Sequence, residues 1–172
     1  MTNKVLVTYA TKYGATAEIA EAIAAALRDE GLEVDLKPVK QAGDLAPYHA
    51  VVLGSAVYIG GWRKEAAKFL LDNEQALAQK DVWLFSSGPT NEGDPLELLN
   101  GWTLPEKLQP VAERIQVHDT AVFHGALDED KLNFVEKFMV SKVGSGVGDF
   151  RDWEVIRTWA ASIAGALKQS AD

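Results

Sequence analysis

The chain has 172 residues, of which 47% are hydrophobic, and its 17 basic and 25 acidic side chains give a formal net charge of −8. This length and composition predict a single domain over residues 1–172 with a substantial core. The acidic charge argues against binding nucleic acid and predicts at most peripheral membrane contact, and the absence of cysteine excludes disulfides, thiolate catalysis and Cys-ligated metal centres.

At the start of the chain, Met1 is followed by polar residues and then by a short apolar run. No long apolar segment occurs here or further on, so we expect neither a signal peptide nor a membrane span, and a cytoplasmic location.

The first predicted strand, Lys4 to Ala10, ends in a loop that precedes a helical pattern. That loop consists of Thr11, Lys12, Tyr13, Gly14, Ala15 and Thr16. The first N–H groups of a helix lack intrahelical partners and carry partial positive charge, so small and hydroxyl residues before a helix favour an anion site. Gly14 permits a tight turn and a close approach of backbone N–H groups to a phosphate.

Two nucleotide-binding patterns are excluded because Gly14 is the only glycine of this loop. The Walker pattern needs a second glycine followed by Lys and Ser or Thr, and the dinucleotide fingerprint needs three glycines. A mononucleotide phosphate is favoured, and the alternative is a capped helix with Thr11 as cap or turn residue.

Apolar spacing predicts helices over 15–30, 62–71 with an irregular continuation to 80, 106–115, 131–143 and 153–168, the last capped by Asp152. Strict alternation over 32–36 predicts an edge strand, whereas the continuous apolar runs 50–54 and 82–85 are typical of central parallel strands. Residues 119–125 form the last predicted strand, and the long segment 91–104 is expected to be functional.

This order predicts an α/β fold, a doubly wound five-stranded parallel sheet of order 2-1-3-4-5 with helices on both faces. Ligands of such sheets bind outside the carboxyl ends of the strands, where the winding reverses. The loops 11–16 and 55–62 are therefore expected to face each other across one crevice, with 86–94 beside them.

The second and third loops have the composition of a slot for a flat ring. The candidate ligand-binding residues in them are Ser55, Ala56, Val57, Tyr58, Ile59, Gly60 and Trp62, then Ser86, Ser87, Gly88 and Pro89. An aromatic side chain can stack on such a ring while loop backbone groups bond its heteroatoms. A phosphate at one end and this slot at the other favour FMN over a nucleotide with a second phosphate.

The sequence resembles flavodoxins, whose phosphate loop Thr/Ser-x-Thr-Gly-x-Thr is matched by residues 11–16 except at Tyr13. Residues 54–58, 62–65, 131–134 and especially 148–153, Gly-Asp-Phe-Arg-Asp-Trp, resemble the flavodoxin-like branch that contains menaquinone-dependent protoporphyrinogen oxidase. The resemblance implies FMN held by the three loops, electron transfer through the flavin, and a place in heme biosynthesis.

Other residues have plainer interpretations. Gly144, Gly146 and Gly148 follow a predicted helix, which indicates a flexible link, and no carboxylate or histidine spacing indicates a metal site. His124 ends a strand on the functional side and is interpreted as structural. Trp83, Trp153 and Trp159 are expected in the core, whereas Trp62 and Trp102 are candidates for flavin or partner contact.

The leading hypothesis is therefore an FMN-dependent oxidoreductase that resembles protoporphyrinogen oxidase, with a porphyrinogen substrate and a quinone acceptor. The alternative is a flavodoxin that carries electrons to a protein redox partner. A flavin-free interaction domain is the third possibility, because fold alone does not decide function.

Overall fold

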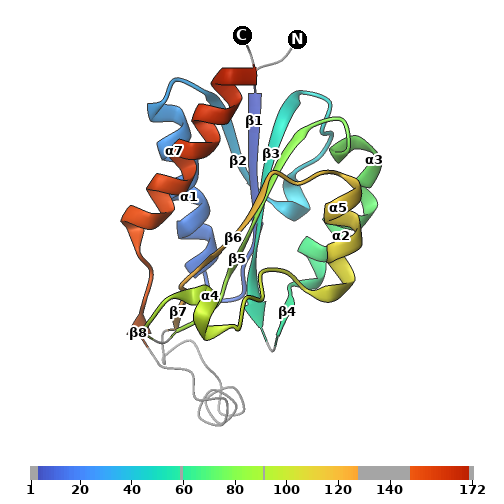
Figure 1. The fold of residues 1–172 in the computed structure, drawn as a ribbon. Coiled ribbons are helices and arrows are strands. Elements are labelled where there is room, and N and C mark those ends of the chain that lie inside the picture. The colour runs from blue at the N-terminus through green and yellow to red at the C-terminus, as the bar shows by residue number, and fades with distance from the viewer. Residues whose placement is uncertain (1–3, 59, 91, 128–147, 171–172) are drawn as a thin grey trace.

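A computed structural model describes residues 4–58, 60–90, 92–127 and 148–170. Its main sheet has five parallel strands in the order β2-β1-β3-β5-β6, and a short strand β4 pairs antiparallel with β3 (Figure 1). The strands are β1 (Lys4–Ala10), β2 (Glu33–Pro38), β3 (Tyr48–Tyr58), β4 (Gly61–Trp62), β5 (Asp81–Ser87) and β6 (Asp119–Phe123). The predicted α/β fold and the predicted order of the five parallel strands are confirmed.

Helices cover both faces of this sheet, as Figure 1 shows. Helices α1 (Ala15–Asp29) and α7 (Trp153–Ser170) lie on one face. The other face carries α2 (Lys64–Asp72), α3 (Glu74–Leu77), α5 (Gln109–Arg114) and the 3-10 turns η1 (Val39–Gln41) and η2 (Glu106–Leu108). Near the carboxyl ends of the strands lie α4 (Pro95–Leu98) and the two-stranded sheet of β7 (Ala126–Leu127) and β8 (Gly148–Asp149).

The hydrophobic core has two halves, one on each side of the sheet. Along β1, Val5 and Val7 pack with α1 and α7, whereas Leu6 packs with the helices of the opposite face. All three side chains are fully buried. Strands covered on both faces read as continuous apolar runs, which explains the sequence pattern of β1, β3 and β5.

Several predicted elements need correction. Trp62 belongs to β4, and α2 begins at Lys64, because the chain after Gly60 first turns back to pair with the end of β3. Helix α4 was not predicted in the segment 91–104; the Asp94 carboxylate caps it by accepting from the N–H groups of Leu96 and Glu97.

At the carboxyl-terminal side, Gly148 belongs to β8 and pairs with Leu127, so it is not part of a simple flexible link. The predicted cap of the last helix is confirmed, since the Asp152 carboxylate accepts from Val155 N–H at 3.2 Å. The predicted helix 131–143, Gly144 and Gly146 lie outside the described residues. None of the helices that the structure describes has the length and hydropathy of a membrane span.

Candidate functional site

The loop after β1 has the backbone geometry of an anion cradle. Gly14 takes the left-handed conformation, with φ 94°, immediately before α1. Its N–H donates to Thr11 Oγ1 at 2.9 Å, and its carbonyl accepts the first bond of α1, from Glu18 N–H at 3.3 Å. The N–H groups of residues 15–17 precede that bond and are the orphan donors of a helix start. No side chain caps α1, so Thr11 acts as a turn residue that braces Gly14.

The two threonines of this loop have different environments. Thr16 is 1% exposed, so its hydroxyl lies inside the protein rather than on the rim of the loop. Thr11 is partly exposed. Within the described residues its oxygen accepts from Gly14 N–H, which leaves its O–H as a donor for an anion.

The predicted second and third loops begin inside strands, because 55–58 still pair within β3 and 86–87 within β5. The second loop is anchored by a buried serine at this strand end. Ser55 Oγ accepts from Arg63 N–H and donates to Ala56 O, both at 2.9 Å. These bonds tie the end of β3 to the start of α2, so the Ser55 hydroxyl is structural. Ala56, Val57 and Tyr58 are partly exposed beyond it, and Gly60 is exposed with φ 72°. Ile59 lies outside the described residues.

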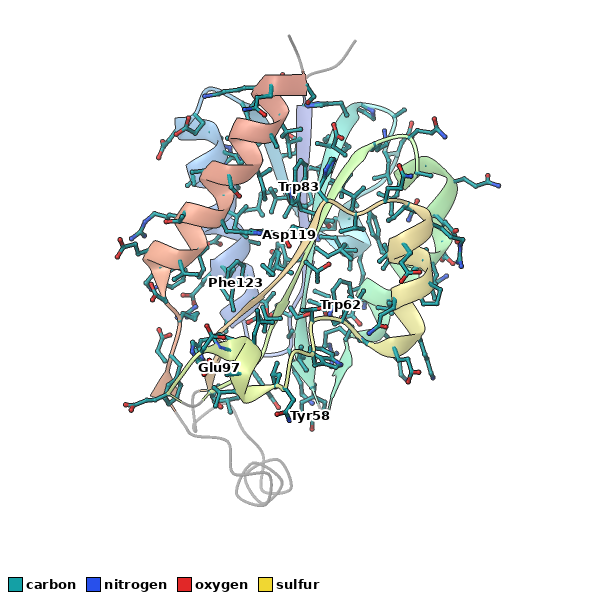
Figure 2. All side chains as sticks on the ribbon, viewed as in Figure 1. Tyr58, Trp62, Trp83, Glu97, Asp119 and Phe123 are labelled. Carbon is teal, nitrogen blue, oxygen red and sulfur yellow. The ribbon has the colours of Figure 1, made fainter. Side chains whose placement is uncertain are left out.

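The first and second loops meet through a cation–π contact. The Lys12 ammonium lies 3.4 Å from the centroid of the Tyr58 ring and 5.5 Å from that of Tyr13. Figure 2 shows Tyr58 at the carboxyl-end tip of β3. Lys12 therefore links the two loops that the strand order places side by side, in addition to the positive charge that it brings.

The third loop is fixed to the second loop from within the core. Trp62 is 8% exposed, and its indole N–H donates to Ser86 Oγ at 2.9 Å, while the Ser86 hydroxyl donates to Thr103 O at 2.7 Å. Trp62 therefore has its indole N–H engaged inside the protein, and its predicted contact with a flavin or a partner stays a prediction. Trp102 is partly buried and packs against the same core.

The backbone of the third loop lies close to its neighbours. Gly88 N–H donates to Phe123 O at 3.0 Å, and a β-carbon on Gly88 would lie 3.3 Å from Val57 Cβ. Ser87 and Pro89 are buried. The close approach of Gly88 to Val57 leaves little space for a side chain, which explains the glycine at this position.

Arg151 is a site residue that sequence reasoning did not identify. Its side chain is 9% exposed, and Nη1 donates to Ala15 O at 3.3 Å and to Glu18 Oε2 at 3.0 Å. Its other bonds go to Asp149, at 2.7 Å from Nη2, and the guanidinium lies over the Trp153 ring. These bonds lower the pKa of Asp149. Arg151 thus fastens the carboxyl-terminal segment to the first turn of α1.

The sequence signal for Arg151 is the Gly148–Trp153 motif, whose resemblance to the oxidase branch assigns no role to any one of its residues. A basic residue 136 positions from Ala15 has no local pattern that places it at the start of α1.

The loops fit a phosphate at one end and an aromatic ring at the other. The phosphate end offers a left-handed glycine, one threonine hydroxyl and the start of a 15-residue helix. The ring end offers the Tyr58 ring and the backbone of the second and third loops. In the part of the chain that the structure describes, no three His, Cys, Asp or Glu side chains are grouped to hold a metal ion.

Comparisons with known structures agree with this fold. The chain is similar to a flavodoxin from the domain Archaea, with 14% identity and a TM-score of 0.63 over 96% of this chain and 99% of that one. It is also similar to the rubredoxin oxygen:oxidoreductase of Desulfovibrio gigas, with 20% identity and a TM-score of 0.65 over 98% of this chain.

The chain spans only 37% of that Desulfovibrio gigas protein. A cysteine-to-serine mutant of the flavodoxin from Pseudomonas aeruginosa matches with 17% identity and a TM-score of 0.58, over 96% of this chain and 99% of that one. At these identities the structures are evidence for the fold alone. No curated protein matches the sequence.

The family assignment comes from the sequence profile. The flavodoxin domain model matches residues 6–153, which include the three loops and the Gly148–Trp153 motif. The chain therefore belongs to the flavodoxin domain family.

Proposed function

We propose that the chain binds FMN at the carboxyl edge of the sheet and transfers electrons through it. The observation that carries this proposal is the left-handed Gly14 at the start of α1, with the Tyr58 ring joined to the same loop through Lys12. Membership of the flavodoxin domain family supports the same ligand.

In this proposal the backbone of the first loop holds the phosphate. The N–H groups of residues 15–17 and the Thr11 hydroxyl are the donors, aided by the positive end of the α1 dipole. Tyr58, Val57 and Gly88 wall the ring, and the Ser55 and Ser86 hydroxyls act from the core by fixing the strand ends. FMN, when bound, supplies the redox chemistry through its ring.

For the reaction itself, we propose oxidation of a porphyrinogen with a quinone as electron acceptor. It rests on the resemblance of residues 148–153 to the protoporphyrinogen oxidase branch, and on the bonds of Arg151 in that motif to the first turn of α1. The motif thus lies beside the proposed phosphate site. A second candidate is a protein-to-protein electron carrier, favoured by similarity to flavodoxins of which this chain spans 99%.

The test of flavin binding is direct. Purified protein should be yellow and should release one FMN per chain on denaturation. A colourless protein that cannot be reconstituted with FMN would overturn the proposal.

To separate the two candidates, we would follow anaerobic oxidation of protoporphyrinogen with a quinone acceptor. The oxidase should show turnover that requires bound FMN, and a pure carrier should show none. Arg151→Gln, assayed at saturating FMN, should lower turnover if the 148–153 motif serves the oxidase reaction. Arg114→Gln is the matched control and should keep turnover, because Arg114 pairs with Glu74 on an exposed surface.

A further inference from the structure

His124 follows β6 directly, and both of its ring nitrogens face backbone carbonyl oxygens of the third loop region. Nδ1 lies 3.0 Å from Pro89 O and Nε2 lies 2.6 Å from Gly93 O. The imidazole also lies near the Phe150 ring, with 6.4 Å between centroids. One side chain therefore contacts two separate points of the segment that leaves β5.

Both contacts of His124 are hydrogen bonds only when both ring nitrogens carry a proton. A carbonyl oxygen only accepts hydrogen bonds, and a neutral imidazole has one N–H and one bare nitrogen. Neutral His124 would therefore direct a lone pair at one of the two carbonyls. Only the imidazolium donates to both Pro89 O and Gly93 O.

The segments that contact His124 carry several charged side chains. Glu92 and Asp94 flank Gly93 on the third loop, and Glu97 follows on α4, where Figure 2 labels it. On the side of Phe150, the carboxylate of Asp149 is paired with Arg151. In the described part of these segments, the charged groups are therefore Glu92, Asp94, Glu97, the Asp149–Arg151 ion pair and Asp152, whose carboxylate caps α7.

We propose that His124 is a positioning residue for the third loop, and that its proton holds the carbonyls of Pro89 and Gly93. The loop is tied to the same strand end by Gly88 N–H to Phe123 O and by Gly125 N–H to Pro89 O, both 3.0 Å. Because Gly88 and Pro89 belong to the proposed ring slot, this inference rests on the proposed function.

The sign of the pH effect follows from the contacts. When the proton leaves, one of the two bonds becomes a contact between lone pairs, and the loop loses one of its supports. If bound FMN needs the loop in this position, FMN binding and protonation of His124 favour each other. The contribution of His124 to affinity is then present while the imidazole carries both protons and is lost when it becomes neutral.

The first test uses the protein without FMN. Nitrogen NMR of the histidine rings across pH should show a state in which both His124 nitrogens are protonated and bonded. The protection of the Gly88 and Gly125 amides, taken as the intrinsic exchange rate at each pH divided by the observed rate, should fall as His124 loses its proton. A bare nitrogen at every pH at which the protein is folded, or protection of both amides that does not follow the His124 signal, overturns the inference.

The second test compares FMN affinity across pH in the wild type and in His124→Phe, which keeps a ring but removes both donors. The wild type should bind roughly tenfold more tightly than the variant while His124 carries both protons, the size of one hydrogen bond from a charged donor, and the ratio should fall once His124 is neutral and keeps only one of its two bonds. Taking the ratio cancels the titration of the FMN phosphate.

The control is His118→Phe, since His118 bonds Asp81 and stacks on Trp83. It should keep the pH profile of the wild type. If His124→Phe also keeps that profile, or shifts affinity equally at every pH, the inference is wrong.

Failure of the proposed function would look different. No FMN binding at any pH would remove the proposed ligand, while the ring nitrogens and the amide exchange would still decide whether His124 holds the loop.

Discussion

Replacing Gly14 with valine should damage FMN binding more than any other single change in the first loop. Gly14 has φ 94°, and a residue with a β-carbon in the left-handed region costs about 1–2 kcal/mol. A β-branched side chain adds to that cost and stands where the backbone must approach a phosphate. Relaxing the strain rotates the N–H groups that follow.

The loss in affinity can be estimated from the hydrogen bonds that the loop N–H groups would make to the FMN phosphate. One hydrogen bond to a charged acceptor is worth about 1.5–3 kcal/mol, so a single misdirected N–H group raises the FMN Kd by about 10- to 100-fold. Fluorescence titration of FMN-free protein measures this directly, because free and bound FMN differ in emission.

Gly31, just beyond the carboxyl end of the same helix, offers a matched control. It has φ 89°, and a β-carbon there would meet nothing within 4 Å. Gly31→Val should therefore lower the free energy of unfolding by a similar amount, while FMN affinity stays at the wild-type value. Thermal unfolding without FMN checks the first expectation.

Lys12→Ala should weaken FMN binding much less than Gly14→Val. Lys12 contributes charge and the contact with Tyr58, and an exposed cation–π contact is worth about 0.5–1 kcal/mol, so the Kd should rise only a few-fold. If Lys12→Ala costs as much affinity as Gly14→Val, or if Gly31→Val costs affinity too, the backbone cradle is not what binds FMN.

Three further outcomes are expected. Ser86→Ala should destabilise the fold by about 1–3 kcal/mol in denaturant titration, because it leaves a buried indole N–H without its acceptor, whereas Trp62→Phe with Ser86→Ala should cost less than the sum of the single changes. Tyr48 should stay protonated up to a pKa of about 12, since burial and the carboxylate that accepts from it raise its pKa; in ultraviolet titration it ionises after a free tyrosine, and its stabilisation is lost as pH rises through that value. The double change Glu92→Gln, Asp94→Asn should raise the more negative FMN potential in redox titration, because fully reduced FMN is an anion in an acidic protein, and an unmoved potential would refute this.

Much of the fold could be predicted because its signals are local. Continuous apolar runs mark β3 and β5 as central strands, and four-residue spacing marks α1. Parallel strands with helical crossovers then leave few topologies, and the strand order places the first three loops at one edge.

The contacts that join the loops could not be predicted, because they depend on side chains far apart in sequence. Trp62 illustrates this: a tryptophan beside two glycines suggests an exposed ring, yet two residues of β4 turn it into the core, where Ser86 accepts its N–H. His124 likewise reveals its second carbonyl partner only in three dimensions.

The position of Arg151 explains how an acidic protein can hold an anion at α1. Glu18 lies in the first turn of that helix, where its charge suits the helix dipole but repels a phosphate. Arg151 bonds Glu18 and, from the other side, Asp149. The guanidinium therefore offsets carboxylates beside the loop and leaves the backbone N–H groups available for the phosphate that we propose there.

Arg151→Gln should for this reason weaken FMN binding without touching the ligand. The freed Glu18 carboxylate then repels the phosphate, so the loss in affinity should be smaller at high salt, which screens exposed charges. The same variant changes acid stability. The pKa of Asp149, which Arg151 lowers, should rise toward its ordinary value in Arg151→Gln. A carboxylate with a lowered pKa in the folded protein adds stability above its unfolded pKa, and this stability is lost as pH falls through the folded pKa. Acid unfolding of the wild type should therefore begin at lower pH than that of the variant.

The rescue experiment identifies the cause of the affinity loss. Glu18→Gln in the Arg151→Gln background should restore most of the affinity; if it restores none, repulsion by Glu18 is not the cause, and Arg151 acts only by packing the carboxyl-terminal segment against α1.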